Sequence, residues 1–188
     1  MLKQIENAHQ TESCQKVLHW FFCFPNDEKG LTELAKELKI SKTTANKTVS
    51  KLVKKELLKK QVISNLWRIK ANNNTYFIKQ KISYNLNLIY NTNLIEEIYK
   101  KIPNAQAIIL FGSYRKGSDT EKSDIDIAVE IIDNKNLEIK ELGKIPRLDF
   151  RKNIPINLYI FSRNKINLNL FANIANGIIL DGFLEVKL

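Results

Sequence analysis

Two aspartates, Asp124 and Asp126, are the residues of this sequence best suited to chemistry. One residue separates them within an apolar run, and alternate residues of a strand point to the same face. We therefore expect both carboxylates on one face, with Ile125 and Ile127 directed into the core. Paired carboxylates suit hard divalent cations, which prefer oxygen ligands.

A glycine and a serine, Gly112 and Ser113, end the apolar run that precedes the aspartates. Gly112 leaves room for a close approach, Ser113 offers a hydroxyl, and backbone N–H groups are available if a helix begins there. These features suit phosphate. Arg115 and Lys116 are placed to neutralise a triphosphate, although either is equally compatible with a solvated loop charge. Together with the aspartates, this stretch predicts a site for a metal and a nucleoside triphosphate.

The order Gly112-Ser113, ten residues, then Asp124-x-Asp126 resembles the signature of the DNA polymerase β-like nucleotidyltransferases. The residues around the aspartates are most similar to the minimal nucleotidyltransferases of archaea and bacteria, and the resemblance covers about residues 105–188. It implies transfer of NMP from an NTP, expected to be ATP, to a hydroxyl acceptor. Members of this group often modify a toxin protein, which makes a toxin a candidate partner.

The resemblance also implies that Asp124 and Asp126 bind two Mg²⁺ ions and take part in catalysis. The family usually adds a third carboxylate, on the strand after an intervening helix, and the matching residue here is Asn157. An amide oxygen can coordinate magnesium, but it has no charge and cannot accept a proton. Asp133 and Asp149 are close in sequence, but neither has the alternating strand position that the geometry requires.

Two functional hypotheses follow from Asn157. In the first, the protein is a magnesium-dependent nucleotidyltransferase. In the second, it is a DNA-binding transcriptional regulator whose transferase fold is catalytically degenerate and binds a nucleotide or a protein partner.

The positive charge of the chain is concentrated in one block. Residues 36–81 contain 13 lysines and arginines and two acidic residues, a net charge of +11. The whole chain carries +10, so the remainder sums to −1. A basic block beside a nearly neutral region favours a polyanionic partner for that block. The alternative is that the lysines only keep the protein in solution.

A helix is predicted over residues 42–57, with Ser41 as its N-cap. Its expected buried stripe consists of Ala45, Val49, Leu52 and Val53. Short polar side chains and lysines share the opposite face, an arrangement that suits phosphate and base-edge contacts in the major groove of DNA. The expected DNA-binding residues are Thr43, Asn46, Lys47, Ser50, Lys51 and Lys54.

Two further helices, over residues 11–24 and 30–38, precede this one, and short strands at 58–63 and 66–69 follow it. This region is similar to a winged helix-turn-helix, which implies binding to double-stranded DNA. A winged-helix regulator that recognises a palindrome would be a homodimer. The alternative is an interaction module, but lysine, asparagine, serine and threonine favour DNA over a protein partner.

We expect an α+β protein with three parts: a winged-helix domain (1–74), a helical linker (75–103) broken near residues 91–93, and a nucleotidyltransferase-like domain (104–188). After the aspartate strand we expect the following elements in order. They are a helical stretch to about residue 148, a strand over 154–161, a helix over 164–176 and short apolar segments at 178–180 and 183–186.

Cys14 and Cys23 have no partner cysteines, so we expect reduced, buried thiols rather than a zinc site or a disulfide. His9 and His19 lie far in sequence from the aspartates, so we assign them to packing or surface rather than to a metal site. No apolar stretch approaches the roughly 20 residues of a membrane span, and no signal peptide is visible. A cytoplasmic location is therefore expected.

Overall fold

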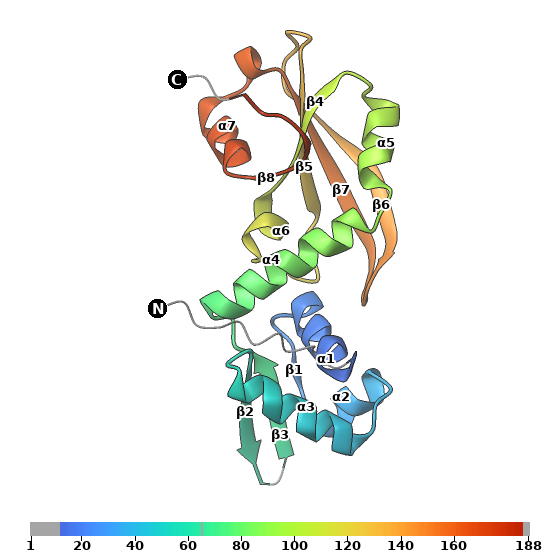
Figure 1. Ribbon diagram of the computed structural model, residues 1–188, viewed down its shortest axis with the longest axis vertical. Helices are drawn as coiled ribbons and strands as arrows, with labels where there is room; N and C mark the ends of the chain where they lie inside the picture. Colours follow the sequence, from blue (N-terminus) through green and yellow to red (C-terminus); the bar gives the residue numbers. More distant parts are fainter. Residues whose placement is uncertain (1–11, 65, 186–188) are drawn as a thin grey trace. The chain divides into compact units, whose positions relative to one another are not determined.

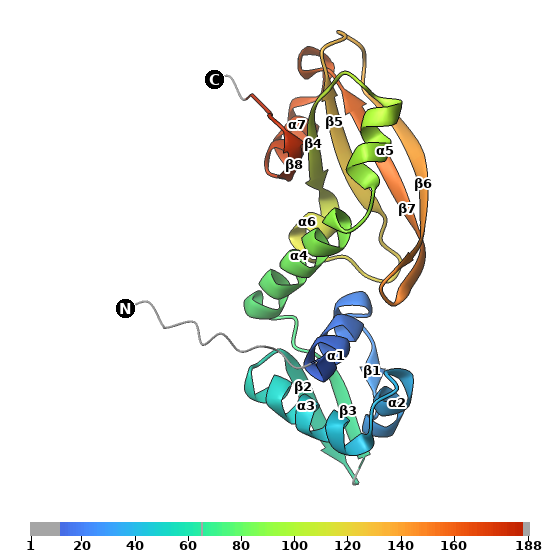
Figure 2. The same ribbon diagram turned by 45° about the vertical axis from the view of Figure 1, so that its right-hand side comes forward.

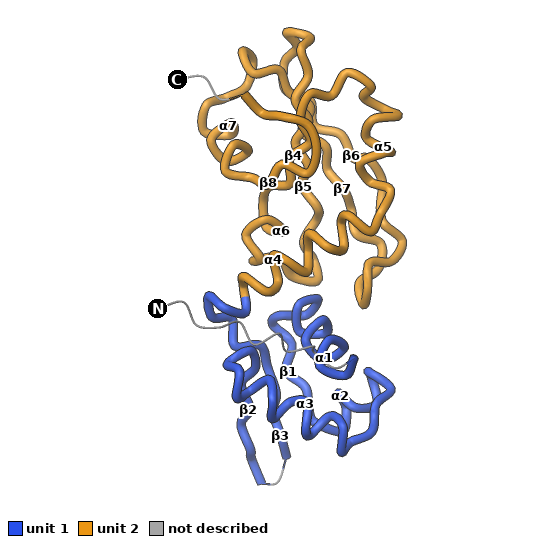
Figure 3. The backbone as a smooth tube through the Cα atoms, in the orientation of Figure 1, with its two compact units in different colours: residues 1–77 blue, residues 78–188 orange. Residues whose placement is uncertain are grey.

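The chain divides into two compact units, residues 1–77 and 78–188 (Figure 3). The structure is a computed structural model that describes residues 12–64 and 66–185. Its mixture of helices and sheets agrees with the predicted α+β class. No helix within these described residues combines the length and the apolar character needed to cross a membrane.

In its described residues, the first unit contains three helices and a three-stranded antiparallel sheet, in the strand order β1-β3-β2 (Figure 1). Its elements are α1 (Glu12–Cys23), β1 (Glu28–Lys29), α2 (Leu31–Glu37), α3 (Lys42–Lys54), β2 (Leu58–Ile63) and β3 (Leu66–Ala71). The two-residue strand β1 is missing from the sequence prediction because it is too short to show a periodic pattern.

Local capping explains where the helices of this unit begin. The Ser41 hydroxyl accepts a hydrogen bond from the Thr44 amide at 3.0 Å, as an N-cap of α3 should. The Gly30 amide donates to the Glu33 carboxylate at 3.0 Å before α2. The buried stripe of α3 consists of Ala45, Thr48, Val49 and Leu52, whereas Val53 is only half-buried.

The second unit is built on a five-stranded mixed sheet in the order β6-β7-β5-β4-β8. Strands β5 and β7 are parallel, and the other neighbours are antiparallel. The helices are α4 (Thr75–Tyr90), α5 (Leu94–Lys101), α6 (Gly112–Lys116), the short 3₁₀ helix η1 (Arg163–Lys165) and α7 (Leu168–Ala175). The strands are β4 (Ala105–Phe111), β5 (Ile125–Ile131), β6 (Glu138–Leu148), β7 (Arg151–Phe161) and β8 (Ile178–Gly182).

Each face of this sheet is covered by different helices. Residues of α4 and α5, such as Ile89 and Ile98, pack with Ile127 of β5 in one cluster. On the other face Ile174 of α7 packs with Phe161 of β7. Figures 1 and 2 show α5 and α7 on opposite sides of the sheet. The alternation of the strands therefore sends isoleucines toward α4 and α5, and Asp126 toward the face that carries α7.

The expected helix before residue 148 is wrong, because this segment is the edge strand β6, paired with β7. Leu142, Ile145 and Leu148 recur every three residues, which resembles a helical pattern. However, Gly143 and Pro146 are poor residues for a helix interior. A register shift between Glu141 and Gly143 also interrupts the two-residue period of the strand and hides it in the sequence.

Other boundaries differ by smaller amounts. Helix α7 begins at Leu168 rather than at residue 164, because Asn167 caps it by accepting hydrogen bonds from the Asn169 and Leu170 amides. The predicted linker, residues 75–103, divides differently: its first three residues belong to the first unit, and its remainder packs within the second.

Cys14 and Cys23 are both buried, as expected, and both are free cysteines in the structure. His19 stacks on Phe22, whereas His9 lies outside the described residues.

Candidate functional site

The parallel pairing of β5 with β7 places Asp126 directly beside Asn157. Asp124 lies one residue before β5 and on the same face. The Asn157 amide nitrogen donates hydrogen bonds to Asp124 Oδ2 at 3.1 Å and to Asp126 Oδ1 at 3.4 Å. Asn157 therefore lies within hydrogen-bonding distance of both aspartates, as its assignment to the same cluster predicts.

The electrostatics of this cluster favour a positive partner. Burial raises the pKa of Asp126 above its ordinary value, the charge of Asp124 raises it further, and the hydrogen bond from Asn157 opposes both effects. The two carboxylates share the Asn157 amide as a hydrogen-bond donor. This amide carries a partial positive charge on its N–H groups but no net charge to balance the carboxylates. A cation between them would relieve their repulsion and favour the ionised form of both.

Gly112 approaches the cluster from the neighbouring strand. Phe111, the last residue of β4, pairs with Asp126, and Gly112 follows it with φ +70° at the start of α6. A Cβ at this position would lie 2.5 Å from Asp126 Oδ2. The site therefore requires glycine for two reasons, the backbone angle and the space beside the carboxylate.

A small cavity of about 260 Å³ lies next to Gly112. Arg115 and Lys116 of α6 line it from one side. The Arg115 Nε is buried and has no hydrogen-bond partner within the described part of the chain. A buried guanidinium nitrogen without an acceptor is suited to an anion. The cavity is completed by Phe111, Leu170, Asn173 and Asn176.

The remaining predicted phosphate contact, Ser113, is half-buried in α6 next to Gly112. The asparagines of α7 were not predicted as site residues, because nothing in the spacing of Asn173 and Asn176 indicates that α7 returns to this end of the sheet.

Tyr159 is a second residue that the sequence analysis missed. It lies two positions after Asn157 on β7, so it shares the face of the aspartates. Burial, followed by the charges of Asp126 and Asp124, raises the pKa of the Tyr159 hydroxyl. Its ring meets Phe111 edge-on with centroids 4.9 Å apart. The two-residue spacing from Asn157 is the signal that could have identified it.

The alternative acids lie elsewhere. Asp149, in the turn between β6 and β7, accepts a hydrogen bond from Tyr84 at 2.7 Å, and Asp133 pairs with Lys135 at 3.1 Å. Within residues 12–64 and 66–185, no three His, Cys, Asp or Glu side chains are grouped as a metal site. Any metal at Asp124 and Asp126 would therefore be held by two carboxylates and neutral ligands.

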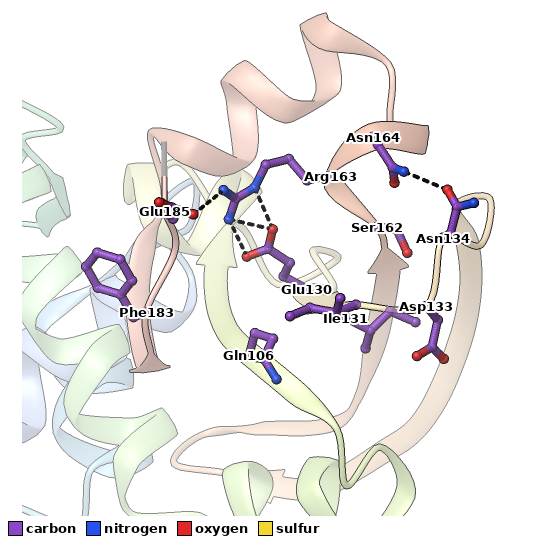
Figure 4. A pocket seen from close by; sticks show the side chains of 11 residues that line it. Gln106, Glu130, Ile131, Asp133, Asn134, Ser162, Arg163, Asn164, Phe183 and Glu185 are labelled. Atoms are coloured by element: carbon purple, nitrogen blue, oxygen red, sulfur yellow. Dashed lines mark hydrogen bonds and ion pairs between the residues drawn. The ribbon is translucent and has the colours of Figure 1, made fainter. Parts of the chain in front are cut away.

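A larger cavity of about 830 Å³ lies at the other end of β5 and β7 (Figure 4). There the Arg163 guanidinium binds the buried carboxylate of Glu130, with its Nε 2.8 Å from Oε1, and also contacts Glu185. None of the predicted site residues lines this cavity, and its arginine is already neutralised by two glutamates. It is a less suitable phosphate site than the cavity beside Gly112.

In the first unit, all six predicted DNA-binding residues of α3 are exposed. The apolar stripe of the helix is buried beneath them, so the polar face is available for contacts. The adjacent hairpin of β2 and β3 carries a lysine over an aromatic ring, with Lys60 Nζ 3.8 Å from the centroid of Trp67. Arg68 on β3 is also exposed.

Comparison with known protein families supports part of the functional assignment of the second unit. Residues 93–181 match the family model described as polymerase beta, nucleotidyltransferase. The match covers just under half of the chain and includes Asp124, Asp126 and Asn157. It supports a nucleotidyltransferase domain of the polymerase β type in the second unit. No curated protein matches the chain.

The nucleotidyltransferase domain should not tolerate a side chain at Gly112. We expect Gly112→Ala to lower the free energy of unfolding by about 1–3 kcal/mol more than a glycine substitution without a clash, the usual cost of overpacking. The reason is the 2.5 Å approach to Asp126 Oδ2. Urea denaturation of the full chain measures the difference.

Gly143→Ala is the matched control. Gly143 also has a positive φ, +140°, but no atom of the described residues outside its own neighbours lies within 4 Å of an added Cβ. Equal destabilisation by the two substitutions would show that backbone strain alone accounts for Gly112 and that the carboxylate can move aside.

Proposed function

We propose that this protein is a magnesium-dependent nucleotidyltransferase that transfers NMP from an NTP, expected to be ATP, to a hydroxyl acceptor. The observation that carries the proposal is that three features lie together. Asn157 links Asp124 and Asp126, the backbone of Gly112 passes close to Asp126, and the cavity that Arg115 lines lies beside Gly112. The family match to residues 93–181 supports nucleotidyl transfer at the level of the family.

The donor set at the aspartates fits magnesium. Asp124 and Asp126 supply carboxylate oxygens, and Asn157 supplies an amide that can turn its oxygen toward a cation. When bound, Mg²⁺ neutralises charge on the phosphates and aligns the attacking and leaving oxygens. The resemblance implies two ions, and Asp124 and Asp126 would hold them.

The cavity beside Gly112 fits the phosphates of a nucleotide. Arg115 brings a buried Nε that has no partner among the described residues, and Lys116 adds a second positive charge at the rim. Gly112 lets the backbone approach closely, and Ser113 offers a hydroxyl. These four residues would orient the triphosphate so that its α-phosphorus lies near Asp126.

In the transfer itself, the acceptor hydroxyl oxygen forms a bond to the α-phosphorus and the bond to the bridging oxygen breaks. Pyrophosphate leaves, and the hydroxyl proton is released to water, because Asn157 cannot accept it. A hydroxyl of a protein toxin is the acceptor that we would test early, as the resemblance to minimal nucleotidyltransferases implies.

A second candidate function is a DNA-binding regulator that retains the transferase fold without turnover. The position of Asn157 favours this second function, because its amide donates hydrogen bonds to both carboxylates and contributes no negative charge to bind a metal. A general base is worth about 10²–10⁴-fold in rate. That factor is roughly 3–5 kcal/mol of the 8–23 kcal/mol that enzymes supply, so its loss slows turnover without necessarily abolishing it.

The nucleotide site is tested by calorimetric titration of ATP into the protein with and without Mg²⁺. We expect magnesium-dependent binding that Asp124→Ala combined with Asp126→Ala weakens by more than about 100-fold, above the 10–100-fold typical of residues behind the ligands. Asp133→Ala with Glu138→Ala removes two exposed charges from the same unit and should leave binding unchanged. Absence of binding for every NTP would favour the regulator.

The role of Asn157 is tested by Asn157→Asp. The added carboxylate should lower the thermal stability of the metal-free protein, because three like charges then share the site. With Mg²⁺ and ATP it should raise transfer, by up to about 10²–10⁴-fold if a base is what the site lacks. Radiolabelled ATP with a hydroxyl acceptor measures this.

The control for this substitution is Asn153→Asp, which adds the same charge to an exposed position on the same strand. Unchanged or reduced transfer in Asn157→Asp, relative to this control, would contradict the assignment of Asn157 to the third carboxylate position.

We also propose that the first unit is a winged helix-turn-helix that binds double-stranded DNA. Its order α1-β1-α2-α3-β2-β3 with a three-stranded sheet supports the assignment. In this arrangement α3 would enter the major groove. The exposed lysines on α3 and the net charge of +11 over residues 36–81 favour a binding energy dominated by phosphate contacts.

For the DNA interface we expect Lys47→Ala with Lys51→Ala to weaken duplex binding and to reduce the slope of log K against log salt by about 2, close to one unit per lysine. Lys144→Ala with Lys152→Ala changes the net charge equally at exposed positions of the second unit. Fluorescence anisotropy over a salt series measures both pairs. Wild-type behaviour of the Lys47 and Lys51 variant would rule out α3 as the DNA-binding surface.

A further inference from the structure

A buried arginine outside the proposed site contacts the residue next to Asp124. Arg151, the first residue of β7, is buried and donates from Nη2 to the Ser123 carbonyl at 2.6 Å and to the Glu121 carbonyl at 3.2 Å. Its Nη1 donates to the Tyr114 hydroxyl. One guanidinium therefore joins α6, the loop after it and the start of β7.

A buried carboxylate lies between this arginine and a buried lysine. Asp119, in the loop between α6 and β5, lies 3.2 Å from Lys81 Nζ and 4.0 Å from Arg151 Nη1, with all three side chains at most 6% exposed. Lys81 also donates to the Asp119 backbone carbonyl. The pairing of three buried charges offsets the cost of removing each from water.

The same loop is also held against α4. Asn85 donates from Nδ2 to Asp119 Oδ1 at 2.8 Å and to the Tyr114 carbonyl at 3.0 Å. A Cβ on Gly117 would lie 3.0 Å from the Ile78 carbonyl oxygen, so the backbone of the loop meets the helix directly. The loop that ends at Asp124 is thus held by hydrogen bonds from Arg151 on one side and from Asn85 of α4 on the other.

We infer that Arg151 is a positioning residue that sets the metal-binding geometry of Asp124 through the Ser123 carbonyl, with Asp119 and Lys81 fixing the arginine. This inference rests on the proposed function, because Asp124 is a ligand only if the site binds a metal. The Ser123 carbonyl belongs to the peptide group that leads into Asp124, so its direction constrains the backbone from which that carboxylate extends.

The choice of arginine matters because of its shape. The planar guanidinium presents several donors in a fixed fork, and Arg151 uses two of its nitrogens for a hydroxyl and two carbonyls. A lysine ammonium would keep the charge beside Asp119, but it is a single point and cannot satisfy acceptors on both sides. Arg151→Lys therefore separates the directional role from the charge.

The experiment titrates Mn²⁺ alone into the full-length protein. We expect Arg151→Lys to weaken Mn²⁺ binding by about 10–100-fold, the usual effect of removing a group that orients a metal ligand. Arg147→Lys is the matched control, because Arg147 is exposed and donates to the Asp149 carbonyl in the adjacent turn. Wild-type Mn²⁺ affinity in Arg151→Lys would overturn the inference.

A double-substitution cycle separates positioning from general destabilisation. In an Asp124→Asn background the ligand that Arg151 positions is already altered, so Arg151→Lys should cause little further loss of Mn²⁺ affinity. A loss that is fully additive with Asp124→Asn would show that the arginine acts elsewhere and would overturn the inference.

Amide hydrogen exchange tests the same contact without a metal. In Arg151→Lys, amides of residues 117–124 should exchange faster, while those of β4 keep their wild-type rates. If the wild-type protein binds no Mn²⁺, the proposed metal chemistry is wrong. Hydrogen exchange then tests by itself whether Arg151 anchors the loop that ends at Asp124. Unchanged exchange in the loop would overturn the anchoring.

Discussion

The parallel register of β5 and β7 is the constraint on which the candidate site depends. It places Asp126 opposite Asn157, and a slip of one residue would turn Asn157 to the face that α4 and α5 cover. Parallel neighbours need a connection that returns the chain to the same end of the sheet. Here the edge strand β6 makes that return, because it runs antiparallel to β7. The isoleucines on the opposite face specify the register, since a slip would remove them from the cluster that they form with α4 and α5.

Asn157 occupies a position at which protein stability and metal binding favour different side chains. Its amide relieves the repulsion of two half-buried carboxylates, which favours the folded protein without a metal. A carboxylate in its place would hold a cation more tightly but would add a third negative charge to the metal-free site. Compared with a carboxylate, Asn157 therefore lowers the metal affinity of the site and raises the stability of the unliganded protein. Both effects hold whether or not the protein turns over a substrate.

Much of this arrangement was predictable from local patterns. The two-residue spacing placed Asp124 and Asp126 on one face, and the strand over residues 154–161 located Asn157 correctly. The capping residue Ser41 indicated where its helix begins. These features depend on near neighbours in the sequence, for which alternation and capping are sufficient guides.

The features that the sequence did not reveal depend on distant contacts. Strand β6 has a three-residue apolar spacing, and only its pairing with β7 makes it a strand. Asn173 lines the cavity because α7 packs on the face of the sheet that carries the aspartates, and Arg151 gains its role from the carbonyls of a loop about 30 residues earlier. Residue types alone could not identify these contacts, because a buried arginine and an exposed one look the same in a single sequence.

The loop between β4 and β5 shows why polar contacts, rather than the apolar core, define this site. At one end the backbone of Gly112 passes close to Asp126, and at the other the Ser123 carbonyl accepts a hydrogen bond from Arg151. Apolar packing is non-directional and sets the strands within the sheet. Hydrogen bonds to a guanidinium are directional, so they can set the angle of a peptide group next to a ligand. A carboxylate placed in this way depends on buried charges that remain favourable only while all of their partners are present.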